Sequence, residues 1–220
     1  FQRVCEDNIG RKRSCAPAGF DAAPDHVYFS QGDGTWADKA QSAGFAAKDG
    51  DGLGILVGDF SHTGRAQVFI ANDGRANFLF IPQVPINATS PTTLWSESAV
   101  NLGCAFDEVG QPQACMGIAA GDLDGDGFED LYVTNFFLES NTLYLNSGAG
   151  GFSDRTRQFG LRIPSLDFLG FGCQCLDPDH DGRLDLVVAN GHVDDFSYKN
   201  IPYKMRPQFS NMSQKRHFLF

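Results

Sequence analysis

Two short acidic segments of this chain place four aspartates within nine residues each. In residues 122–130 and again in residues 177–185, aspartates stand at positions 1, 3, 5 and 9 of the segment. Carboxylates crowded this closely repel one another, so the arrangement is unfavourable unless a cation neutralises it. All of these ligands are hard oxygens, which favours Ca²⁺ over Zn²⁺ or copper. The alternative interpretation is a pair of solvated acidic turns.

We expect each segment to bind one Ca²⁺ through its four carboxylates and the backbone carbonyl at position 7. Glycines lie inside both segments, where a tight turn must wrap the ion. The first predicted ligand set is Asp122, Asp124, Asp126, Asp130 and the carbonyl of Phe128. The second predicted ligand set is Asp177, Asp179, Asp181, Asp185 and the carbonyl of Arg183.

Neither segment is an EF-hand loop. An EF-hand needs a bidentate Glu at its twelfth position, where this chain has Val133 and Val188. Short apolar, β-branched runs follow both segments, at residues 131–134 and 186–189, and such runs are typical of strands. The acidic segments therefore connect strands rather than helices.

The acidic segments belong to a longer internal repeat. An apolar residue and a glycine precede each first aspartate, as in Met116-Gly117 and Phe171-Gly172. A third copy begins at Leu53-Gly54 and contains the related segment 59–67.

The third copy keeps the turn but has lost most of its charge. Ser61, Thr63 and Gln67 stand where the other copies have acids. Hydroxyl and amide ligands alone bind calcium weakly, so we expect this degenerate loop to hold no metal. Internal hydrogen bonds should maintain its shape instead.

Further strand signals lie between the acidic segments, at residues 77–81 and 141–145, and glycine-rich turns follow, as at 148–151. Each repeat thus contains about four short strands, which is the content of one propeller blade. A single blade cannot bury both of its faces, so blades must stack around an axis. The predicted fold class is all-β, a β-propeller of four-stranded blades, with three to four blades in 220 residues.

Several segments resemble FG-GAP and VCBS repeats, which form β-propellers such as the integrin α-subunit head. They include both acidic segments and the Gly-Asp-Gly-Thr-Trp run at residues 32–36. Further phrases resemble the cartilage acidic protein family, often found with an ASPIC/UnbV domain, of which no segment is visible here. These phrases lie in residues 24–36, 71–80, 165–172, 188–192 and 206–207.

The resemblance covers most of residues 24–210 and implies an extracellular, or in bacteria periplasmic, calcium-bound propeller. Such propellers usually have seven blades, so we interpret this chain as part of a larger ring. The missing blades then belong to the same polypeptide or to a second copy that closes the ring. We divide the chain into a disulfide-containing lead-in loop, residues 1–26, and propeller blades over residues 27–220.

Six cysteines, an even number, suit an oxidising compartment. Cys5 and Cys15 bracket a polar loop and are expected to pair. A bond between Cys104 and Cys115 would close a hairpin. The last two either form a strained bond within one strand or remain buried thiols, and these are Cys173 and Cys175. Asn87 and Asn211 begin possible glycosylation sequons.

Charge and hydropathy argue against nucleic-acid binding and against a membrane span. The net charge is −10, and the 17 basic residues form no stripe, so nucleic-acid binding is disfavoured. The chain has no apolar run of about 18 residues, so we expect no membrane span.

Three functional hypotheses remain. The first is an extracellular, non-catalytic binding or adhesion module with structural Ca²⁺ and a protein or glycan partner at its rim loops. The second is a self-assembling structural subunit of a surface layer, matrix or extracellular fibre. The third is a polysaccharide-active enzyme, but His62, His180 and His192 form no identifiable catalytic set with other residues. We therefore predict a protein that is not an enzyme.

Overall fold

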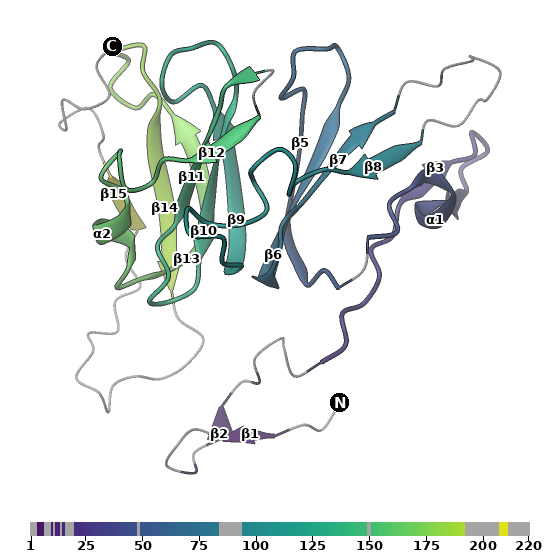
Figure 1. The fold of residues 1–220 in the computed structure, drawn as a ribbon, viewed down its shortest axis with the longest axis horizontal. Coiled ribbons are helices and arrows are strands. Elements are labelled where there is room, and N and C mark those ends of the chain that lie inside the picture. The colour runs from purple at the N-terminus through teal and green to yellow at the C-terminus, as the bar shows by residue number, and fades with distance from the viewer. Residues whose placement is uncertain are drawn as a thin grey trace.

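The protein is all-β, as predicted, and its strands lie side by side along a curved path (Figure 1). The computed structural model describes residues 4–6, 10, 12–13, 15, 20–47, 49–83, 94–148, 151–191 and 207–210. Two four-residue helices, α1 (Ala40–Ala43) and α2 (Arg162–Ser165), lie between strands. Within these described ranges, no helix is long and apolar enough to cross a membrane.

Three antiparallel units follow one another along the chain, and in each unit every strand pairs with the next. They correspond to the predicted blades, and we call them blades I, II and III. Blade I contains β5 (Gly52–Gly58), β6 (Gln67–Arg75), β7 (Phe78–Pro82) and β8 (Trp95–Glu97). Blade II contains β9 (Gln113–Gly121), β10 (Asp130–Asn135), β11 (Thr142–Asn146) and β12 (Phe152–Asp154). Blade III contains β13 (Leu169–Leu176), β14 (Asp185–Gly191) and β15 (Pro207–Ser210).

The second strand of blade II shows why its sequence forms a central strand. All six residues of β10 are buried. Leu131 and Val133 belong to the core shared with blade I, whereas Tyr132 belongs to the core shared with blade III. A strand covered on both faces needs an uninterrupted apolar run rather than alternation, and this run is what the sequence supplies.

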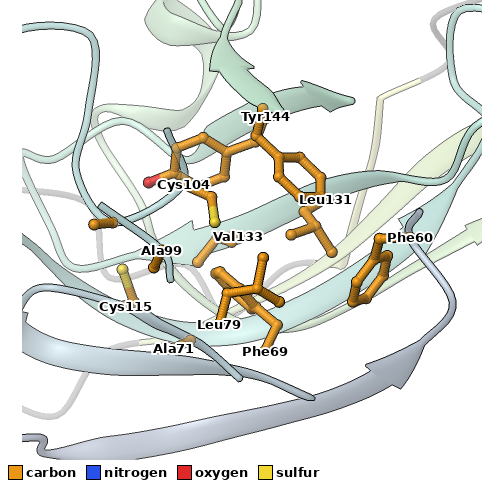
Figure 2. Packing of buried hydrophobic residues seen from close by; sticks show 12 residues of the cluster. Phe60, Phe69, Ala71, Leu79, Ala99, Cys104, Cys115, Leu131, Val133 and Tyr144 are labelled. Atoms are coloured by element: carbon orange, nitrogen blue, oxygen red, sulfur yellow. The ribbon is translucent and has the colours of Figure 1, made fainter. Parts of the chain in front are cut away.

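Hydrophobic cores lie between neighbouring blades. Figure 2 shows the core between blades I and II, where Phe69 and Leu79 meet Leu131, Val133 and Tyr144. Each blade thus buries its apolar faces against its neighbours, as expected of a repeat protein.

The core between blades II and III is built in the same way. Tyr132 and Leu143 of blade II pack with Leu186 and Val188 of blade III. β10 therefore contributes to two cores at once, because its alternate side chains point to opposite faces.

A separate hairpin of β3 (Tyr28–Ser30) and β4 (Trp36–Asp38) packs beside blade I. Val27 and Phe29 lie in a third core with Phe80 of β7. The ring of Phe45, which follows α1, lies 4.6 Å from the Phe80 ring, measured between centroids.

Near the N-terminus, two short strands, β1 (Cys5–Glu6) and β2 (Lys12–Arg13), form a small sheet of their own. A disulfide joins Cys5 to Cys15, as the sequence predicts. The expected bond between Cys104 and Cys115 is wrong, because both are free thiols. They lie in the core between blades I and II, where they pack as small apolar side chains.

Cys173 and Cys175 are also free thiols, so the second of the two alternatives applies to them. They lie two residues apart on β13 and pack against the core between blades II and III. Their side chains leave the strand on the same face and in parallel, which does not bring the sulfurs into bonding geometry.

Candidate metal centre

Three corresponding loops connect the first and second strands of the blades: loop I (residues 59–67), loop II (residues 122–130) and loop III (residues 177–185). Because each loop follows the first strand of its blade, all three lie at the same end of the molecule, along the upper edge of Figure 1. The acidic segments therefore occupy one rim.

The three loops have the same backbone conformation although loop I lacks most of the acids. In each loop, positions 4 and 6 have a positive φ, which favours glycine. The residues at position 4 are His62 (51°), Gly125 (82°) and His180 (59°). The residues at position 6 are Gly64 (76°), Gly127 (92°) and Gly182 (85°).

The aspartate at position 1 organises each loop from inside. One of its carboxylate oxygens accepts a hydrogen bond from the backbone N–H at position 6 in all three loops. The N···O distances are 2.6 Å for Gly64 and Asp59, 3.0 Å for Gly127 and Asp122, and 2.9 Å for Gly182 and Asp177. The turn is therefore encoded by an aspartate and a glycine five residues apart.

Loop II brings three of its predicted ligands together. The carboxylates of Asp122, Asp124 and Asp130 each offer an oxygen, and these oxygens lie within 4.8 Å of one another. The Asp130 carboxylate, on a residue with 0% exposure, accepts N–H bonds from Leu123 at 2.8 Å and Asn146 at 2.9 Å.

The electrostatics of loop II fit a cation. Burial raises the pKa of Asp130 to about 7, and the carboxylates of Asp124 and Asp126 act in the same direction. Burial also raises the pKa of Asp124. The ionised carboxylates are thus held where water and protein stabilise them poorly, and a divalent cation among them would offset that cost.

Loop III brings together Asp177, Asp179 and Asp181, each of which offers a carboxylate oxygen within 4.8 Å of the other two. These three aspartates are more exposed than the three of loop II. The backbone N–H of Gly182 lowers the pKa of Asp177, and the guanidinium of Arg183 pairs with the Asp181 carboxylate. Part of the negative charge is already compensated here, so the electrostatic demand for a cation is weaker than in loop II.

Other predicted ligands lie outside these two groups, and their part in metal binding stays a prediction. Asp126 accepts a bond from the backbone N–H of Phe128 at 2.8 Å, and Asp185 is buried at the start of β14. The ligand role of the Phe128 and Arg183 carbonyls is likewise a prediction. Three sequence-based candidates fall outside the described residues, namely Asn87, His192 and Asn211.

Loop I keeps its shape through internal hydrogen bonds, as expected. The Gln67 side-chain amide donates to the Ser61 hydroxyl at 2.7 Å, and the backbone N–H of Thr63 donates to Asp59 at 2.9 Å. Backbone donors, first of all Thr63, lower the pKa of Asp59. Hydrogen bonds from neutral groups here do part of the work that a cation would do in loop II.

One residue that ties loops I and II together was not expected from the sequence. The side-chain amide of Asn146 donates to the carbonyl of Phe60 in loop I at 2.8 Å and to that of Glu129 in loop II at 3.0 Å. The His62 ring of loop I also lies 4.7 Å from the Phe128 ring of loop II. The only sequence signal was an asparagine at a strand end, just before a glycine turn.

Phe60, at position 2 of loop I, fixes this loop to the hydrophobic core. Its side chain is buried in the core between blades I and II, where its ring lies edge-to-face with the ring of Phe152 from β12. Leu123, at the same position of loop II, is buried in the core between blades II and III. The residue at position 2 of each of these loops therefore fastens the loop to the next blade.

Comparison with known proteins agrees with this repeat. Residues 122–188, from loop II into β14, match the FG-GAP-like repeat family. The chain is 25% identical over 185 residues to cartilage acidic protein 1 of Homo sapiens and to its Mus musculus counterpart. The match covers 76% of this chain but 24% of the human and 25% of the mouse protein, so the chain spans about a quarter of the length of the curated relatives it matches. The chain thus carries FG-GAP-like repeat sequence and resembles the cartilage acidic proteins.

Proposed function

We propose that this chain is part of an extracellular β-propeller that binds Ca²⁺ at loops II and III and acts as a non-catalytic binding module. The observation that carries the proposal is that two clusters of three carboxylates lie at the same rim of two neighbouring blades. Their hard oxygen ligands suit calcium, and their glycine-containing turns are preformed by the chain itself.

The proposed role of calcium is structural. Asp122, Asp124 and Asp130 would hold one ion, and Asp177, Asp179 and Asp181 the other. The bound ion would neutralise the negative charge that each cluster of carboxylates concentrates. Because Asp130 is hydrogen-bonded to Asn146, and Asn146 to loop I, stabilising loop II would also stabilise the contact between two blades.

The compartment and the partner follow from different features. The disulfide between Cys5 and Cys15 supports an oxidising environment outside the cytoplasm, and so does the likeness to cartilage proteins. Loops on a rigid scaffold are the usual place for recognition, so the rim that carries loops II and III is where a protein or glycan partner would bind.

Thermal unfolding with and without calcium tests the proposal. At a free Ca²⁺ concentration 100 times its Kd, each site should add about 2.7 kcal/mol to the free energy of unfolding. The Tm should therefore be higher in calcium than in a chelator. Asp122→Asn and Asp177→Asn should each remove part of this shift.

The matched control is Asp59→Asn in loop I. This change should lower the Tm equally in calcium and in chelator, because we expect loop I to hold no metal. A Tm that does not respond to calcium in the unmodified chain would contradict a structural role for the ion.

A further inference from the structure

In blades II and III, alternate residues of the first strand point toward the preceding blade and pack against it. In β9, Ile118 and Ala120 pack against the core shared with blade I. In β13, Cys173 and Cys175 pack against the core shared with blade II. The second strand of the preceding blade contributes to each core, through Phe69 of β6 in blade I and Tyr132 of β10 in blade II. In blade I, Leu56 of the first strand contributes as well.

The corresponding residues of β5 lack such a cover among the described residues. Ile55 and Val57, which align with these covered residues, are 68% and 61% exposed. Leu53, two residues before Ile55 on the same strand, is 59% exposed. We call these three residues the β5 stripe. In blades II and III, the preceding blade packs against the counterparts of Ile55 and Val57, whereas an exposed apolar stripe of this kind is typical of an interaction surface.

The β3–β4 hairpin corresponds to the outer half of blade II. Residues 27–38 align without a gap with residues 143–154, which form β11 and β12. The turns that follow also agree: the N–H of Phe45 bonds to the carbonyl of Ala40 at 2.8 Å, and that of Leu161 to Thr156 at 3.0 Å. In blade II, β11 pairs with β12 on one side and with β10 on the other. β3 pairs with β4, and no described strand lies on its other edge.

Asp25 occupies a position that carries an asparagine in blades I and II. In blade I, the Asn77 side-chain oxygen accepts the backbone N–H of Asn72 at 3.0 Å. In blade II, Asn141 does the same for Asn135, also at 3.0 Å. Asp25 stands at the equivalent place, two residues before Val27. Its carboxylate offers the same kind of acceptor to the backbone N–H of an incoming second strand.

We propose that the free edge of β3 and the β5 stripe together bind one β-hairpin, the inner strand pair of a further blade. The second strand of the hairpin pairs antiparallel with β3, in the register by which β10 pairs with β11. Apolar side chains from its two strands cover Leu53, Ile55 and Val57. The hairpin ends beside Asp25.

An intact second copy of this chain does not fit this surface. The second strands of the three blades are β6, β10 and β14, and each already has a partner on its outer edge. A second copy can therefore cover the β5 stripe but offers β3 no open second strand. The occupant is instead a hairpin of the repeat type whose outer edge is unpaired.

The test adds such a hairpin to the full chain. A copy of residues 113–135, which form β9, loop II and β10, is fused ahead of residue 1, so that residues 1–24 connect it to β3. Hydrogen exchange then reports on the backbone amides of β3. We expect them to exchange at least about tenfold more slowly than in the unextended chain.

Two variants make the test specific. Tyr132→Pro in the added copy removes a backbone donor from its second strand and should abolish the protection. Val57→Asp should leave the unextended chain unchanged, since Val57 is exposed there, but should abolish the protection in the extended chain.

Three results would overturn the proposal. The first is unchanged exchange of β3 in the extended chain. The second is equal protection by the copy that carries the proline. The third is a concentration-dependent dimer of the unextended chain that protects β3, which would assign the surface to a second copy.

Discussion

At the scale of single residues, two glycines set how closely neighbouring blades approach. A Cβ atom on Gly54 would lie 2.6 Å from the carbonyl oxygen of Met116, and one on Gly117 would lie 2.0 Å from that of Phe171. These are contacts with backbone atoms, which cannot move aside as a flexible side chain can. The glycine in each repeat copy was visible in the sequence, but the carbonyl that requires it belongs to the next blade.

Gly117→Ala should therefore lower the free energy of unfolding by about 2–3 kcal/mol, through overpacking between blades II and III. Gly172→Ala is the matched control, because nothing lies within 4 Å of a Cβ there and its φ is not in the left-handed region. Urea unfolding of the two variants measures the difference. Equal stability of both variants would show that the close approach is not rigid.

At the scale of elements, the strands that follow the acidic loops could be predicted because their apolar runs are local signals. The runs 131–134 and 186–189 lie in β10 and β14. The prediction of a bond between Cys104 and Cys115 was wrong because the environment of these thiols is not a local property. Proximity along the chain indicated a hairpin, but burial between two blades depends on residues far away in the sequence. The tie through Asn146 was missed for the same reason.

The junction between blades I and II carries partly buried acids. β6 pairs with β9 through Asp73 and Ala114, and the Glu139 carboxylate accepts the N–H of Ala114 at 2.7 Å. Burial raises the pKa of Asp73, and the nearby carboxylate of Asp51 adds to the effect. Burial likewise raises the pKa of Glu139.

Asp73→Asn should reveal this pH dependence. The folded pKa of Asp73 is above its unfolded value, so the stability linked to its protonated form is fully present below about pH 4 and is lost as the pH rises through the folded pKa. The variant cannot ionise, so its stability relative to the unmodified chain should increase from about pH 4 to about pH 7. Urea unfolding across this range measures it.

Asp33→Asn is the control with the opposite sign. The hydroxyl and the backbone N–H of Thr35 lower the pKa of Asp33. The contribution of ionised Asp33 to the stability of the fold is therefore present above its unfolded pKa and is lost as the pH falls through its folded pKa. A relative stability of Asp73→Asn that does not change with pH would contradict the raised pKa.

At the scale of the whole molecule, the blades share cores in pairs and carry their acidic loops on one rim. Internal repetition was enough to predict an all-β propeller and the place of the loops. The expected number of seven blades in the ring comes from the resemblance alone, because a repeat pattern predicts the type of blade and not how many blades close the ring. Loops II and III lie one blade apart, so two calcium ions would act on the two consecutive interfaces of this arc.

Calorimetric titration of the chain with Ca²⁺ tests this account most directly. We expect two ions per chain, one after Asp122→Asn or Asp177→Asn, none when both are changed, and two after Asp59→Asn in loop I. Absence of binding heat in the unmodified chain, or a stoichiometry that neither loop II nor loop III affects, would contradict it.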